Sequence, residues 1–299
     1  AATKYNYNME NNLEKPLVSW LLSSGVLIDE KDHISHGGVH AGFDTHSKTW
    51  LFVYSEITGY AISMFCMLYK KYGDLQYLGV ASKSASFLIR NQVPVYVKNN
   101  GGSFPEGLRI NDFSTMPRHY TFDAAMCIQG LMDLYTITND SSLLDSAIKA
   151  GNWLLSMQDP TGFFLSYYDS DTELAEHRGP FFYEDAGCLH AKHSIALLKL
   201  FNITKDERYK ESAKKVCDWV LSLQNDDGSF WANPSQSHVY AHAHCYATEG
   251  LIYAFDQLGT NEYNDVIKRA LRWLDNKIIP KYGALLGTHK ISREFHPTE

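Results

Sequence analysis

Acid–base chemistry is suggested by six side chains that fall in four polar stretches of the chain. They are Glu56, Asp123, Glu184, Asp185, His242 and His244. Two carboxylates could act together in hydrolysis, one as a protonated acid and the other as base or nucleophile. A histidine or tyrosine with a neighbouring cation could instead act in proton exchange beside an anionic group. We take these six residues as the candidate catalytic groups.

A second set of residues lies in the same stretches and is expected to bind substrate. This set is Asp44, Tyr54, Arg118, His119, Tyr120, Tyr168, His190, Trp231 and Tyr240. Structural roles remain open for several candidates: Asp123, Glu184 and Asp185 suit helix starts, and His190 suits a hydrogen-bonded core. The histidines show no metal-ligand spacing, so we expect neither a metal nor a cofactor.

An internal repeat indicates the elements that must position these residues. Phe87, Trp153 and Trp219 are spaced by 66 residues within three matching segments that end at Gln92, Gln158 and Gln224. A fourth copy follows at a spacing of 54 residues, and a faint fifth precedes the first. Apolar residues recur in each copy at i, i+3, i+4 and i+7, which predicts an amphipathic helix with Asp or Asn at its start and a glycine turn after its end.

A second, more apolar helix is expected before each copy, at about 56–72, 121–138, 184–203 and 240–258. These helices carry little charge and should form an inner layer, with the amphipathic helices outside them. The long loops would then gather at the amino-terminal ends of the inner helices. The predicted fold is all-α, a single α/α toroid of helical hairpins over residues 1–299. About four and a half pairs can be counted, which leaves open whether the ring closes.

Composition narrows the classes of partner. The net charge is −7 and no basic stripe is present, so nucleic acid and anionic membranes are disfavoured. No apolar run reaches the length of a membrane span. The five widely spaced cysteines are read as reduced and mostly buried thiols. We expect a cytoplasmic location, with a removed leader as the alternative, and the sequence does not indicate the oligomeric state.

The outer-helix pattern followed by Gln, a turn and Gly-x-Phe resembles the α/α-toroid superfamily. That superfamily includes six-hairpin glycosidases, uronate epimerases and lyases, and terpenoid cyclases. SEITGY (55–60) and HAHCYATEGL (242–251) resemble elements of uncharacterised toroid proteins from polysaccharide gene clusters, whereas FDAAMCIQGL (122–131) departs from their Thr-Gly-Gln element. LQNDDGSFW (223–231) resembles the QW repeat of terpenoid cyclases, but DSDT (169–172) is only half of their DxDD acid motif.

The resemblance implies an enzyme acting on an oligosaccharide or polysaccharide. A glycoside hydrolase with a carboxylate pair is the leading hypothesis. A uronate epimerase or a polysaccharide lyase that uses His and Tyr is the first alternative. A glycan-binding toroid without catalysis is the second, and a terpenoid cyclase ranks last because the loops are too polar for a hydrocarbon.

Overall fold

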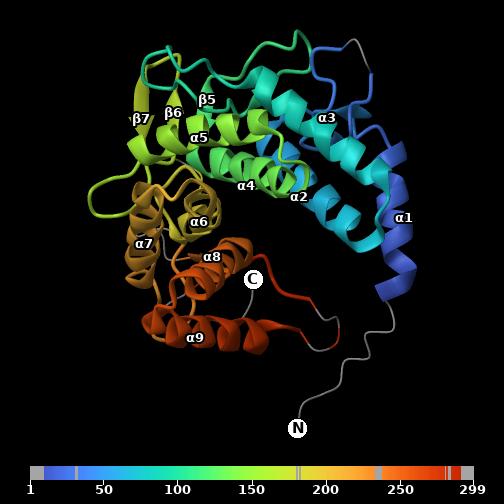
Figure 1. The fold of residues 1–299 in the computed structure, drawn as a ribbon. Helices are drawn as coiled ribbons and strands as arrows, with labels where there is room; N and C mark the ends of the chain where they lie inside the picture. Colours follow the sequence, from blue (N-terminus) through green and yellow to red (C-terminus); the bar gives the residue numbers. More distant parts are fainter. Residues whose placement is uncertain are drawn as a thin grey trace.

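Helical hairpins follow one another around an arc, with their inner helices packed side by side (Figure 1). The computed structural model describes residues 10–30, 33–179, 181, 183–232, 238–279, 281 and 284–290. The inner helices are α2 (Ser55–Tyr72), α4 (Thr121–Thr138), α6 (His193–Thr204) and α8 (Ala241–Leu258). The outer helices are α3 (Leu75–Asn91), α5 (Ser141–Ser156), α7 (Glu207–Leu221) and α9 (Asn261–Lys277). The predicted α/α toroid and its two layers are confirmed.

A single helix, α1 (Glu10–Ser23), precedes the first hairpin and lies beside α2 and α3 (Figure 1). It corresponds to the faint fifth copy. The first and last inner helices both keep an exposed apolar residue: Met67 of α2 is 59% exposed and Ile252 of α8 is 44% exposed. The described residues form four hairpins and one extra helix, with the inner helices packed in the order α2, α4, α6 and α8.

Three of the outer helices, α3, α5 and α7, begin where the sequence predicted, at an aspartate, whereas α9 begins at Asn261 without a side-chain cap. Asp74, Asp140 and Asp206 each accept a hydrogen bond from the backbone N–H two residues further on. These bonds satisfy one of the amide groups that a helix start leaves without a partner. The inner helices α2, α4 and α8 start without such a side-chain cap.

Short strands precede three inner helices, and the sequence analysis did not predict them. β3 (Val53–Tyr54), β5 (Arg118–Tyr120) and β8 (His238–Tyr240) run directly into α2, α4 and α8. All described strand pairs are antiparallel. The remaining strands are β1 (Phe43–Asp44), β2 (Thr49–Trp50), β4 (Gly107–Leu108), β6 (Tyr167–Asp169), β7 (Leu174–Glu176) and β9 (Thr288–Lys290). They fix the long loops at the end of the arc where the inner helices begin.

The third inner helix departs from its prediction. It was expected to start near residue 184, but a 3₁₀ turn, η1 (Cys188–Lys192), precedes α6. Glu184 and Asp185 therefore lie in the loop and not in a first helical turn. Their carboxyls accept hydrogen bonds from the backbone N–H groups of Phe181 and Gly179, which bends the loop back on itself.

The cysteines were predicted to be reduced and mostly buried. Four of the five are buried, Cys245 is exposed, and all five are free thiols. No helix within the described residues is long and apolar enough to cross a bilayer.

The repeated glutamine connects each hairpin to the next. Gln158 Nε2 donates to the carbonyl oxygens of Gly162, in the following turn, and of Ser212, on the next outer helix, at 2.9 and 3.1 Å. Gln92 and Gln224 make the equivalent pair of bonds in their own repeats. The QW-type pattern is thus a structural joint between neighbouring hairpins.

Replacing Gln158 by Ala should therefore destabilise the protein by about 1–3 kcal/mol, because two carbonyl groups lose their donor. The matched control is Gln257→Ala, since Gln257 lies exposed on α8 and bonds only to surface side chains. Urea denaturation measures both. Equal effects of the two substitutions would contradict the joint.

Candidate active site

Two carboxyl groups from different hairpins meet at the start of the inner layer. Glu56 stands in the first turn of α2 and Asp123 in the first turn of α4. Tyr54, the last residue of β3, lies between them and its hydroxyl donates to Asp123 Oδ1 at 3.4 Å. The structure therefore brings together three residues that the sequence analysis selected.

The close approach of α2 and α4 explains why these acids meet. A Cβ atom on Gly59 would lie 2.7 Å from the carbonyl oxygen of Met126, and one on Gly130 would lie 2.5 Å from the carbonyl oxygen of Gly59. Real side chains cannot be accommodated at such distances, so both helices need glycine here. The contact sets the first turns of the two helices side by side.

Burial gives the two acids unusual proton affinity. Asp123 is only 2% exposed, and its Oδ2 has no hydrogen-bond partner among the described residues. Desolvation raises the pKa of Asp123 well above its ordinary value, and the charge of Glu56 raises it further. Desolvation also raises the pKa of Glu56, against the opposing effects of Tyr54 and Lys192. The pair is therefore arranged to hold a proton at a pH where isolated acids have lost theirs.

A third carboxylate, Glu106, joins this pair, and the sequence analysis did not select it. Antiparallel pairing of Tyr54 with Gly107 places it at the start of α2, where its carbonyl oxygen accepts from Ser55 N at 2.9 Å. Burial raises the pKa of Glu106, while Arg118 acts in the opposite direction. Its charge also raises the pKa of Asp123. Counted from the repeated Gly-x-Phe turn, Glu106 is equivalent to Ser166 and Ala232, and this exception to the repeat could have identified it.

Lys192 is the second residue that sequence reasoning missed. Its side chain is 4% exposed, and Nζ lies 2.8 Å from Glu249 Oε2. The same ammonium group lies 4.8 Å from the ring centre of Tyr60 and 4.2 Å from that of Tyr246. Tyr60, Lys192 and Tyr246 occupy equivalent positions of the repeat, so three inner helical segments direct the same position toward one point.

Arg118 holds the other side of the site together. Its guanidinium pairs with Glu184 and donates to the hydroxyl of Tyr120 at 3.0 Å. Asp169 Oδ2 lies 3.7 Å from Arg118 Nε, and the ring centre of Tyr167 lies 4.8 Å from the guanidinium carbon. Arg118, Tyr120 and Glu184 are thus brought into contact, as predicted residues of one site.

The start of α8 contributes an aromatic and imidazole group. His242 is exposed and its ring centre lies 6.1 Å from those of Tyr240 and Tyr246. Tyr246 in turn contacts Phe122 of α4, with ring centres 5.2 Å apart. Partial burial lowers the pKa of His242, which favours the neutral imidazole. Trp231, in the preceding loop, is half-buried.

Three predicted histidines lie in the core. His244 accepts from the N–H of Phe230 and bonds to the carbonyl oxygen of Ala270, both at 3.2 Å. His119 bonds to Asn100 and Ser103, and Tyr168 packs against it. Burial lowers the pKa of His244 and of His119 to about 4, and that of His190 to about 3. Lowered pKa values favour the neutral imidazole in all three. The hydrogen bonds of His244 and His119 support structural roles for these two, whereas Nδ1 of the buried His190 has no hydrogen-bond partner among the described residues.

Two predicted acids are engaged in loops. Asp44 accepts from the N–H of His46 and the hydroxyl of Ser47, and so closes the turn between β1 and β2. Asp185 accepts from Gly179 N at 3.3 Å. Neither is brought to the pair of Glu56 and Asp123 by a contact in the structure. Within the described residues, no group of three or more His, Cys, Asp or Glu side chains is arranged to hold a metal ion.

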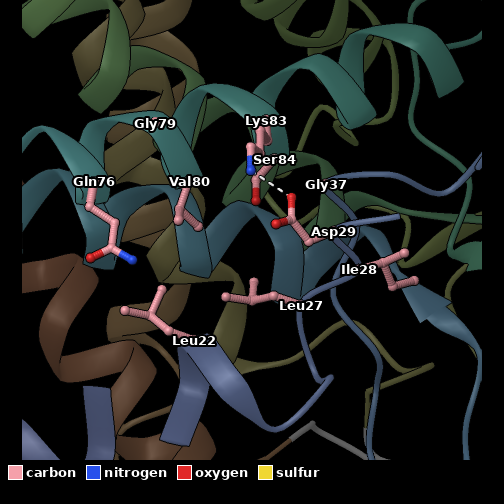
Figure 2. A pocket seen from close by; sticks show the side chains of 10 residues that line it. All are labelled: Leu22, Leu27, Ile28, Asp29, Gly37, Gln76, Gly79, Val80, Lys83 and Ser84. Carbon is pink, nitrogen blue, oxygen red and sulfur yellow. Dashed lines mark hydrogen bonds and ion pairs between the residues drawn. The ribbon is translucent and has the colours of Figure 1, made fainter. Parts of the chain in front are cut away.

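A pocket of about 280 Å³ opens in a different part of the molecule, between α1, α3 and residues 27–29 and 37 (Figure 2). Its lining includes the apolar side chains of Leu22, Leu27 and Val80 and the ion pair between Lys83 and Asp29 at 2.5 Å. None of the predicted site residues lines it, so this pocket is separate from the acid cluster.

Known proteins share the sequence pattern and the fold. The model of the family described as Squalene-hopene cyclase C-terminal domain matches residues 104–283. No curated protein matches the chain.

Among solved structures, the GH76 alpha-mannanase of Bacteroides thetaiotaomicron is similar with a TM-score of 0.70 and 16% identity, over 95% of this chain and 76% of that one. A D-mannose isomerase is similar with a TM-score of 0.68 and 12% identity, over 87% of this chain and 70% of that one. The cellobiose 2-epimerase of Bacillus thermoamylovorans is similar with a TM-score of 0.66 and 10% identity, over 83% of this chain and 70% of that one. At these identities the likeness shows the fold alone.

The buried acids should cost stability at neutral pH. Because burial raises the pKa of Glu56 and Asp123, the folded chain retains protons that the unfolded chain releases, so stability is lost as the pH rises above the unfolded values near 4. The double variant Glu56→Gln, Asp123→Asn avoids this loss. Its gain in unfolding free energy over the wild type should be smallest near pH 4 and reach about 1–3 kcal/mol at pH 7. Urea denaturation across this range measures the gain, and a gain independent of pH would refute the assignment.

The two histidines of α8, His242 and His244, should differ in how much each contributes to the stability of the fold. His244→Ala leaves a buried N–H and carbonyl without partners and should destabilise the fold by about 2–4 kcal/mol. His242→Ala, at an exposed position of the same helix, should change stability by no more than about 0.5 kcal/mol. Thermal unfolding of both variants tests this, and a neutral His244→Ala would overturn the structural assignment.

Proposed function

The chain belongs to the Squalene-hopene cyclase C-terminal domain family, and we propose that it uses this helical scaffold as a carbohydrate-active enzyme that hydrolyses an oligosaccharide or polysaccharide. The observation that supports the proposal is the convergence of Glu56, Asp123 and Glu106 from three segments of the chain, all with pKa values raised by burial. Clusters of this kind are typical of sites where protons are transferred.

The arrangement suits hydrolysis with an acid and a base. Glu56 is the more exposed member of the buried pair and is the proposed proton donor to the glycosidic oxygen. As the bond between the anomeric carbon and that oxygen breaks, the leaving sugar departs as an alcohol. Water attacks the anomeric carbon and passes its proton to Glu106, whose charged form Arg118 favours. Burial keeps the pKa of this donor high, and Asp123, which accepts a hydrogen bond from Tyr54, is the neighbouring acid whose own pKa the charge of Glu56 raises.

The structural neighbours support this class of substrate. The names of the three proteins similar in fold refer to a mannanase, a mannose isomerase and a cellobiose epimerase. Their low identity leaves the reaction of this chain to be established from its own residues.

Epimerisation or elimination on a uronate is the second candidate. The exposed, neutral His242 beside Tyr240 and Tyr246 favours it, because such an imidazole can accept a proton from carbon. A glycan-binding role without catalysis would leave the three carboxyls without a function.

A terpenoid cyclase, which the family description brings to mind, ranks below both. Charged side chains of Glu56, Glu106, Arg118 and Lys192 line the region where the loops gather. Asp169 of the DSDT segment accepts from Asp171 N and lies by Arg118, which engages it in a turn. These polar surroundings suit a sugar better than a hydrocarbon.

The test follows products by mass spectrometry in D₂O on a panel of neutral and uronate oligosaccharides. Glu56→Gln, Asp123→Asn and Glu106→Gln should each lower kcat/KM by about 10²–10⁴, the usual contribution of an acid or base. The matched control is Asp133→Asn, on the same helix as Asp123 but paired with Lys199 and Ser63.

Cleavage that survives in all three variants would refute the carboxylate mechanism. Deuterium incorporated at carbon without cleavage, and lost in His242→Ala, would establish epimerisation instead. Tight binding of one glycan without turnover would leave only the binding role.

A further inference from the structure

The cations beside the acid cluster are already neutralised by the protein's own carboxylates. Arg118 pairs with Glu184, which is 1% exposed on its side chain, and has Asp169 at 3.7 Å. The face of the guanidinium lies over the ring of Tyr167, and one of its N–H groups donates a hydrogen bond to the hydroxyl of Tyr120. The guanidinium therefore has two acidic partners and an aromatic face in the free protein, and a ligand would have to displace them.

Lys192 is engaged in the same manner. Its ammonium group lies 2.8 Å from Glu249 and rests between the rings of Tyr60 and Tyr246. The close contact of α8 with η1 maintains this pairing: a Cβ atom on Gly250 would lie 2.2 Å from the carbonyl oxygen of Ala191. Glu249, the neighbour of that glycine, is thereby fixed beside Lys192.

Arg109, the remaining cation that acts on Glu106, belongs to its own hairpin. It donates from Nη1 to Thr115 O at 2.9 Å and to Ser114 Oγ at 3.2 Å, and its charge contributes to lowering the pKa of Asp112. Its side chain is exposed.

The three carboxyls of the site differ from Arg118 and Lys192 in their ion pairing. Among the described residues, Glu56, Asp123 and Glu106 make no ion pair within 4.0 Å. A ligand that enters beside them meets acids that make no such ion pair, while Arg118 and Lys192 already have acidic partners. Like charges placed together in such surroundings are strongly unfavourable.

We propose that the site selects neutral sugars and rejects uronates at the position next to Glu56, Asp123 and Glu106. This selectivity rests on the proposed function of the same site. It separates the two leading candidates, because a uronate epimerase or lyase needs a cation for the substrate carboxylate, and the structure has assigned Arg118 and Lys192 to Glu184 and Glu249.

The test compares each neutral sugar with its own oxidised form. The probes are α-linked mannohexaose and β-linked cellohexaose. Each is compared with its C6-oxidised form, in which carboxylates replace the primary alcohol groups. Binding is measured by calorimetry and turnover by mass spectrometry. The wild type should favour the neutral member of a pair by at least about tenfold, which corresponds to about 1.4 kcal/mol.

Two substitutions should weaken that preference by releasing a cation. Glu184→Gln frees Arg118, and Glu249→Gln frees Lys192; Glu249 is half-exposed, so this second variant changes no buried acid. Each should raise the affinity for the oxidised probe by about threefold to tenfold relative to the neutral one. Glu207→Gln, which removes a surface partner of Lys210, is the matched control and should leave the ratio unchanged.

The outcomes are distinct. A wild type that prefers an oxidised probe would overturn the selectivity while leaving a carbohydrate enzyme in place. An unchanged ratio in both Glu184→Gln and Glu249→Gln, with folded proteins confirmed by circular dichroism, would also overturn it. Failure of every probe to bind or react would remove the proposed function, and this inference with it.

Discussion

The close contact between α2 and α4 is the constraint on which the site depends. Gly59 and Gly130 remove the side chains that would hold the helices apart, and the first turns of both helices then lie side by side. Glu56 and Asp123 are placed together as a result, and β3 with β4 brings Glu106 to the same place. A looser contact would admit water between the acids and return their pKa values toward ordinary ones.

The same contact buries the acids and thereby lowers the stability of the folded protein. Buried acids without ion pairs destabilise the native state, whereas capped outer helices, the glutamine joints and a core of apolar inner helices stabilise the rest of the scaffold. An enzyme commonly keeps such a locally unfavourable arrangement because its chemistry requires it. The repeated hairpins supply the stability that the first two hairpins give up at their loop ends.

The fold was readable from the sequence because its signals are local. Helical periodicity, aspartate caps and glycine turns recur at fixed spacing, and they placed the helices within a few residues, except that α6 starts at His193 and not near residue 184. The site was only partly predictable: Glu56 and Asp123 were among the candidates selected from the sequence, but Glu106 and Lys192 become neighbours of this pair only through strand pairing and helix packing. His244 shows the converse, since its sequence context resembles a site and its hydrogen bonds to Phe230 and Ala270 belong to the core. The 3₁₀ turn before α6 likewise depends on loop contacts that no periodicity encodes.

The central claim is that burial raises the pKa values of Glu56, Asp123 and Glu106, so that the cluster retains a proton at a pH where isolated acids have lost theirs. Carboxyl ¹³C NMR of protein labelled in its Asp and Glu side chains measures this directly, one titrating group at a time. The account predicts carboxyl signals that titrate clearly above the ordinary range near 4, and that disappear in Glu56→Gln, Asp123→Asn and Glu106→Gln. If every carboxyl titrates at its ordinary value, the cluster is hydrated and ionised, and the proposed acid catalysis has no proton donor.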